Sequence, residues 1–130
     1  MAAEKAEQAL VDQWRDILAL HARTQCELDR VLHQHGLGAS DFEVLDVLAE
    51  ARSADGACTY RVQEIAERVH LSQSALSRLI ARLEKDGLVE RKMCPEDRRG
   101  VRVALTAKGR TLHVDVLPVQ RAVLTRMLAT

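Results

Sequence analysis

The fold is decided by residues 71–109, which read LSQSALSRLIARLEKDGLVERKMCPEDRRGVRVALTAKG. Ser72 can cap a helix, because its side chain can accept a hydrogen bond from backbone N–H groups one turn further on. Lys85 suits the negative end of the helix dipole, and Gly87 supplies a left-handed stop. The stretch therefore predicts a helix over 72–85, followed by two short strands.

The predicted helix has one apolar and one polar face. Its apolar residues recur at steps of three and four, which places them on one side: Leu76, Leu79, Ile80 and Leu83. The opposite face carries small and basic residues: Gln73, Ser74, Ser77, Arg78, Ala81, Arg82 and Lys85. Small residues allow close approach to a DNA groove, and arginines reach guanine edges or phosphates. Because any surface helix has a solvated charged face, the neighbouring segments must decide between these interpretations.

A second short helix is predicted immediately upstream. Residues 61–69 read RVQEIAERV and carry apolar side chains at helical spacing. Only a short break at His70 and Leu71 separates the two helices, and so tight a turn predicts a helix-turn-helix. His70 stands where a glycine is common, and histidine tolerates a left-handed backbone better than most residues. We therefore interpret His70 as structural rather than as a ligand.

Residues 88–93 and 101–105 are predicted to form the two strands of a wing. The second of these alternates apolar and polar residues, as a half-buried strand does. Between the strands, Arg98 and Arg99 would lie at a hairpin tip, where an arginine can enter a narrow minor groove. Asp97 would hold such a guanidinium by a bidentate pair. The alternative is a solvated hairpin with a surface ion pair worth ~0–1 kcal/mol; beside a groove-shaped helix, we favour the DNA interpretation.

Residues 83–109 resemble the MarR family of bacterial transcription regulators. The matching pieces are LEKDGLVER at 83–91, the wing pattern D-x-R at Asp97 and Arg99, and the exit pattern V-x-L-T-x-x-G at 103–109. The resemblance implies a homodimeric repressor that binds a palindromic promoter site on double-stranded DNA and releases it on sensing an effector. By position it assigns Ser74, Ser77, Arg78 and Arg82 to the groove-reading helix and Arg99 to the minor groove.

The expected architecture is mainly α-helical with a small β-hairpin. We expect one MarR-like domain over residues 1–130, with a winged helix-turn-helix core at 40–105 between dimerisation helices at 4–35 and 106–130. Ser40 and Glu43 are spaced as a capping box for the helix that follows the first. The two terminal helices carry more apolar surface than a small domain can bury, which argues for a homodimer. Family members usually continue into a further helix, so a sequence that stops at Thr130 indicates either truncation or a reduced interface.

Charge and composition agree with a small regulator. The chain of 130 residues has no net charge, yet residues 61–110 hold 12 of the 19 basic and 7 of the 19 acidic residues. This half is therefore net positive, which suits phosphate attraction, and the remainder is net negative. The sequence shows no signal peptide, no membrane span and three scattered cysteines, so we expect a cytoplasmic protein that does not act on membranes.

Three kinds of effector are considered, and none is strongly indicated. A thiol switch would use Cys26, but the chain has one tyrosine, at Tyr60, where peroxide-sensing relatives have several. Zinc would use His21, His33, His35 and His113 with Cys26, Glu27 and Asp41, whose spacing matches no tight motif. An organic effector would lie between the dimer helices and the winged core, lined by Trp14, Leu18, His21 and Phe42. We expect no metal and no cofactor.

Two other classes of function are weighed against DNA binding. An enzyme is not expected, because the chain has neither a phosphate-binding glycine loop nor an ordered catalytic set. A winged helix that binds another protein is the closer rival, since a fold does not fix a function. The paired arginines of the wing and the small, basic outer face of the helix favour DNA, because a protein-docking winged helix needs neither.

Overall fold

The computed structural model describes residues 1–55, 60–93 and 101–129, and in these ranges helices dominate. In chain order the elements are α1 (Ala2–Leu32), a 3-10 turn (His33–His35), α2 (Ala39–Asp55), β1 (Tyr60–Arg61), α3 (Val62–Val69), α4 (Gln73–Lys85), β2 (Val89–Met93), β3 (Val101–Leu105) and α5 (Ala107–Leu128). The mainly α-helical class with a small β element is therefore confirmed.

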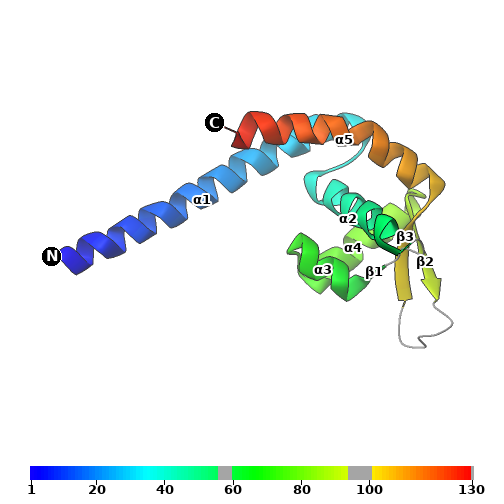
Figure 1. The fold of residues 1–130 in the computed structure, drawn as a ribbon, viewed down its shortest axis with the longest axis horizontal. Helices are drawn as coiled ribbons and strands as arrows, with labels where there is room; N and C mark the ends of the chain where they lie inside the picture. The colour runs from blue at the N-terminus through cyan, green and yellow to red at the C-terminus, as the bar shows by residue number, and fades with distance from the viewer. Residues whose placement is uncertain (56–59, 94–100, 130) are drawn as a thin grey trace.

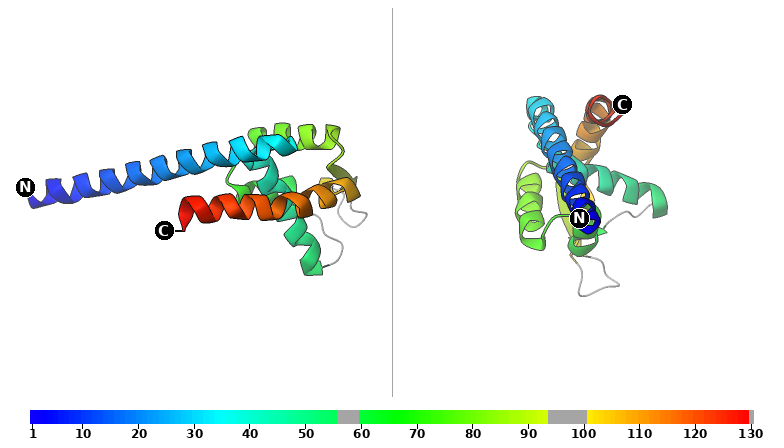
Figure 2. Two further views of the ribbon diagram at one scale, coloured as in Figure 1. Left: turned by 90° about the horizontal axis from the view of Figure 1, so that it is seen from above. Right: turned by 90° about the vertical axis from the view of Figure 1, so that its left-hand side faces the viewer.

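The helices fall into two groups. Helices α2, α3 and α4 pack together beside the strands, whereas the two long helices α1 and α5 form an arm in which α5 also packs against α2 (Figure 1). The second half of α1 runs beside α5, and the first half projects away from the rest of the molecule (Figure 1 and the left view of Figure 2). Arg126 of α5 donates to Glu27 of α1 at 2.7 Å, which ties the two long helices together.

The strands form one antiparallel sheet in the order β1-β3-β2. Val103 in β3 pairs with Tyr60 of β1 on one side and with Arg91 of β2 on the other. The hairpin β2–β3 was predicted, but β1 was not, because two residues are too few to show an alternating pattern. The wing hairpin is thus held to the first residue of the helix-turn-helix through a third strand.

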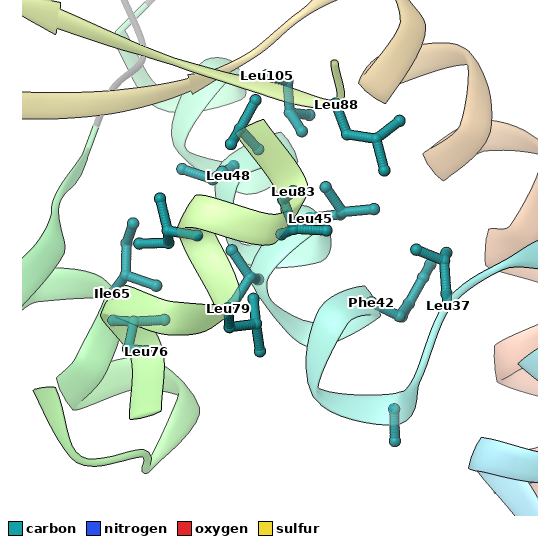
Figure 3. Close-up of a cluster of buried hydrophobic side chains, with 14 of the residues drawn as sticks. Leu37, Phe42, Leu45, Leu48, Ile65, Leu76, Leu79, Leu83, Leu88 and Leu105 are labelled. Carbon is teal, nitrogen blue, oxygen red and sulfur yellow. The ribbon is translucent and has the colours of Figure 1, made fainter. Parts of the chain in front are cut away.

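The winged unit, which comprises α2 to β3, has an aliphatic core. Helices α2, α3 and α4 direct leucines and isoleucines toward one another and toward the strands (Figure 3). Phe42, Leu45, Ile65, Leu76 and Ile80 are fully buried there. Burying such side chains stabilises a fold by about 1.5–3 kcal/mol each before conformational entropy is subtracted. The apolar face predicted for residues 72–85 is the face that enters this core.

The junction between α1 and α2 differs from the prediction. Helix α2 begins at Ala39, so Ser40 lies inside the helix and the predicted capping box with Glu43 is wrong. Two carboxylates satisfy the free backbone groups instead: the Gly38 N–H donates to Asp41 Oδ2 and the Ala39 N–H donates to Asp29 Oδ1, each at 2.7 Å. The second acceptor lies ten residues upstream, which is why local spacing could not reveal it.

Candidate nucleic-acid interface

Helix α4 presents its polar face to solvent. The Ala75 N–H donates to Ser72 Oγ at 3.2 Å, so the predicted N-cap is confirmed. Apolar residues on the opposite side are buried, with Leu76 and Ile80 at 0% exposure. The candidate groove-reading residues Gln73, Ser74, Ser77 and Arg78 are all exposed. Both faces of this helix are thus placed as the sequence predicted.

The turn before α4 is held by a histidine in the left-handed region. His70 has φ 58° and ψ 43°, and its N–H donates to the Ala66 carbonyl oxygen at 3.0 Å. It is the one non-glycine residue with positive φ among those the structure describes. The structural interpretation of His70 is confirmed: the residue ends α3 and sets the angle at which α4 begins.

The wing strands approach α4 through charged side chains. Arg91 of β2 lies 3.4 Å from a carboxylate oxygen of Glu84 in α4, and both side chains are exposed. Gly87, with φ +77°, allows the chain to turn from α4 into β2. The predicted wing residues Asp97, Arg98 and Arg99 lie outside the described residues.

Arg82 occupies a different environment from the other candidate DNA-binding residues. It lies one turn beyond Arg78 on α4, and its guanidinium forms an ion pair with Asp41 at the start of α2. The Arg82 side chain is 59% exposed, whereas that of Asp41 is 7% exposed. Arg78 has no ion-pair partner within the described ranges. Two arginines that look alike in the sequence therefore have different surroundings.

A cavity of about 590 Å³ lies between α1 and the helix-turn-helix. Its walls come from the middle of α1, the first turn of α2, and the end of α3 with the turn that follows. The lining residues are His21, Thr24, Gln25, Leu28, Ala39, Ser40, Glu43, Arg68, Val69, His70 and Leu71. The cavity thus contacts both the arm that carries α1 and the turn that positions α4.

The residues predicted to line an effector pocket are distributed differently. His21 does line this cavity. Trp14 and Leu18 lie on the projecting half of α1 with 57% and 46% exposure, and they are not part of its wall. Phe42 is fully buried and stacks on His113, with ring centroids 5.5 Å apart. The expectation for Phe42 is thus corrected: its ring is in the core, because it fills the space between α2 and α5.

Sequence reasoning missed several polar groups of the cavity. The hydroxyl of Thr24 is buried and has no hydrogen-bond partner in the described part of the chain. Arg68 lies with its guanidinium carbon 4.6 Å from the Tyr60 ring centroid, a cation–π arrangement. These residues come from α1 and α3, which are far apart in the sequence. No local pattern marks them, since only the packing of the two helices brings them together.

Glu43 connects the cavity to a polar network between α2 and α5. Gln120, 2% exposed, donates from Nε2 to Glu43 Oε1 at 3.3 Å. Partial burial raises the pKa of Glu43 above its ordinary value, and the negative charge of Asp46 adds to this effect while Arg121 opposes it. Asp46 itself is paired with His113 at 2.8 Å and Arg121 at 3.1 Å. The network links α2 to α5.

The histidines considered for zinc are dispersed. His113 faces Asp46 in the network above, whereas His33 and His35 lie in the 3-10 turn. Within the described ranges, no three His, Cys, Asp or Glu side chains are arranged to hold a metal ion. Cys26 is exposed on α1. In the same ranges, no helix is both long and apolar enough to cross a lipid bilayer.

Comparison with known proteins matches the winged unit to one family. The model of the MarR family matches residues 39–101, which span α2 to the start of β3. Among curated proteins, the HTH-type transcriptional regulator MhqR of Bacillus subtilis is 28% identical over 102 residues, covering 78% of this chain and 66% of that protein. The HTH-type transcriptional repressor MdtR of the same organism is 29% identical over 126 residues, covering 97% and 77%.

Solved structures extend the likeness to both terminal helices. The crystal structure of Sco3205, a MarR family transcriptional regulator from Streptomyces coelicolor solved in complex with DNA, superposes with a TM-score of 0.79 at 31% identity. The superposition covers 95% of this chain and 74% of that one. The shared architecture therefore includes α1 and α5 as well as the winged unit.

Proposed function

The chain belongs to the MarR family, and on that premise we propose that it is a DNA-binding transcription regulator. In its full form the proposal is a homodimeric repressor that binds a palindromic promoter site and leaves it when an effector binds. Its named relatives are regulators rather than enzymes, which agrees with the absence of a catalytic set in the sequence. Four features of the molecule support the proposal.

The observation that carries it is the exposed polar face of α4. Ser74 and Ser77 are small, so the helix backbone can approach the floor of a major groove closely. Arg78 lies beside them and has no carboxylate to neutralise it among the described residues, so its guanidinium is available to a guanine edge or a phosphate. An ordinary solvated face would not need to combine small side chains with an unpaired arginine.

The wing supplies the second contact in this proposal. Arg99 would enter the minor groove and Asp97 would orient it, with Arg98 beside them. Such contacts position the protein on the duplex without reading much sequence. Gln73, near the N-terminus of α4, would complete the major-groove contacts.

The arm supports a homodimer. Residues 2–23 of α1 are all exposed, although Leu10, Trp14, Ile17 and Leu18 lie along one side of this stretch. Exposed apolar patches of this kind mark interaction sites. A second copy of α1 is the proposed partner, because a two-fold axis would bring two α4 helices to successive major grooves, about 34–36 Å apart.

The cavity between α1 and the helix-turn-helix is the proposed effector site. An organic molecule there would contact His21 on α1 and the Thr24 hydroxyl, which has no hydrogen-bond partner among the described residues, and Arg68 and His70 beside the turn. Filling it would displace the turn relative to α1 and so change the separation of the two α4 helices. Release of DNA follows from that change, because the two half-sites can no longer be contacted together.

Selection of duplexes from a random pool tests the proposal. We expect the protein to enrich a palindrome and Arg78→Gln to change the preferred base at one position in each half-site. Arg99→Ala should weaken binding to all duplexes and lower the slope of log affinity against log salt by about 0.9 for each phosphate that the variant no longer neutralises. Arg15→Gln on the projecting half of α1 is the matched control and should change neither property. The proposal fails if no duplex is enriched over the random pool.

A further inference from the structure

We infer that Arg82 is a positioning residue: its ion pair with Asp41 fixes α4 against the junction of α1 and α2. In this role Arg82 does not read DNA, and it sets the spacing at which two α4 helices of a dimer meet a duplex. The effect on DNA rests on the proposed function, whereas the mechanical role within one chain does not.

Asp41 lies in an environment that requires a positive partner. Its carboxylate is 7% exposed, and each oxygen has a partner: Oδ1 accepts from Arg82, and Oδ2 accepts from the Gly38 N–H at 2.7 Å. A buried carboxylate is costly unless it is paired and hydrogen-bonded. If Arg82 moved to a DNA phosphate, Asp41 would lose its counter-charge. Moving Arg82 from Asp41 to DNA would therefore cost free energy, because it would leave a buried carboxylate without its counter-charge.

The ion pair joins two elements of the fold at their ends. Asp41 lies in the first turn of α2, next to the junction that ends α1, and Arg82 lies in the last turn of α4. A hollow of about 410 Å³ lies at this point, lined among others by Arg82, Asp41, Asp29 and His33. The ion pair therefore adds a polar connection between the end of α4 and the junction, beside the apolar cluster that contains Leu37 and Leu83.

Arg78 and Arg82 differ in their partners although both lie on α4. The two arginines are four residues apart, so they lie on the same side of α4 one turn from each other. Arg78 is exposed and without a carboxylate partner in the described ranges, and Arg82 is paired across 41 residues of sequence. The chain thus assigns reading to the first turns of α4 and positioning to its last turn.

Amide hydrogen exchange of the unliganded protein tests the mechanical role without DNA. Arg82→Gln and Asp41→Asn should each raise exchange at both ends of the connection, the α1–α2 junction at 38–42 and the end of α4 at 85–87, by about tenfold. Arg82→Lys keeps the positive charge, so it should retain part of the protection from exchange that Arg82→Gln loses. Arg78→Gln is the matched control and should leave both segments unchanged. Unchanged exchange in Arg82→Gln would overturn the inference.

DNA binding then separates positioning from reading. The probes are the palindrome that the unsubstituted protein selects and its derivatives with one base pair added or removed at the centre. Arg82→Gln and Asp41→Asn should each lower affinity for the selected palindrome by about tenfold, and the double variant should lose no more than either one. Both should also lower the penalty for altered spacing, with the salt slope and the preferred bases unchanged.

The opposite result would assign Arg82 to DNA. In that case Arg82→Gln lowers the salt slope by about 0.9 per phosphate or alters a preferred base, while Asp41→Asn leaves affinity unchanged or raises it by freeing the guanidinium. If the unsubstituted protein selects no duplex at all, the proposed function fails. The exchange experiment still tests whether the ion pair holds α4 to the junction. Failure of the DNA-binding function and failure of the positioning role are therefore distinguishable.

Discussion

Helix α4 and the first half of α1 carry similar sequence patterns and have opposite surroundings. Both place large apolar side chains at steps of three and four residues. In α4 these side chains are buried by α2, α3 and the sheet, and Leu76 and Ile80 have 0% exposure. In α1 the corresponding side chains are open to solvent: Leu10 is 66% and Trp14 57% exposed.

The difference shows what an amphipathic pattern establishes. It identifies a surface that has to be covered, but not the segment that covers it. The apolar side of α4 is covered by other elements of the same chain, so it is buried when the chain folds. For the first half of α1 the cover would come from a second chain, so its burial would depend on protein concentration.

The largest effect is expected from truncation on the buried side. Leu76→Ala should lower the free energy of unfolding by about 2–5 kcal/mol, because the cavity left behind adds to the lost transfer energy. Chemical denaturation followed by circular dichroism measures this change. The loss of unfolding free energy should not depend on dimer formation. Ser77→Ala, at the adjacent exposed position, serves as the control and should cost less than about 1 kcal/mol. Similar losses in both variants would contradict the division of this helix into two faces.

A smaller effect of another kind is expected on α1. Trp14→Ala should weaken self-association by about 2 kcal/mol, roughly thirtyfold in the dissociation constant, because buried aromatic anchors dominate interfaces. Sedimentation equilibrium over a range of concentrations measures it, and the helical content of each folded chain should not change. Asp16→Ala, on the opposite side of the same helix, is the control. If Trp14→Ala unfolds the chain instead, the apolar side of α1 is needed for folding, as that of α4 is, and the contrast between the two helices is wrong.

The smallest effect concerns Glu43, which lines the cavity between the second half of α1 and the turn before α4. The pKa of Glu43 is raised above its ordinary value near 4.5, mainly by burial, so the charged form is disfavoured in the folded state. Its contribution to stability is therefore complete below that ordinary value and is lost as pH rises through the raised pKa. Glu43→Gln should stabilise the protein near neutral pH by a few tenths of a kcal/mol, because solvent screens this partly exposed group. The gain should vanish under acid conditions.

Denaturation of both proteins at several pH values measures this gain. Glu43→Ala separates the charge from the contact, because alanine also removes the acceptor for Gln120 Nε2. It should be less stable than Glu43→Gln at every pH. A gain for Glu43→Gln that grew under acid conditions would contradict the direction of the pKa shift.

The candidate interface could be predicted where local rules act. The N-cap at Ser72, the left-handed turn at His70 and the buried side of α4 follow from spacing and backbone preference, and the structure has all three. Asp97, Arg98 and Arg99 stay predictions, since they lie outside the described residues. The pairing of Arg82 was not foreseen, because its partner lies 41 positions away and nothing in the sequence marks Asp41 as buried.

The sequence by itself determined the helices of the winged unit, the hairpin β2–β3 and the family pattern, because these depend on neighbours in the chain. Only the tertiary structure decided strand β1, the acidic cap between α1 and α2, and the lining of the cavity, because each depends on at least one contact between different elements of the fold. Gly109 illustrates both a sequence pattern and a tertiary constraint. The exit pattern marks it in the sequence, yet only packing explains it: a Cβ there would clash with the Leu88 carbonyl oxygen, where the start of α5 meets the chain entering β2.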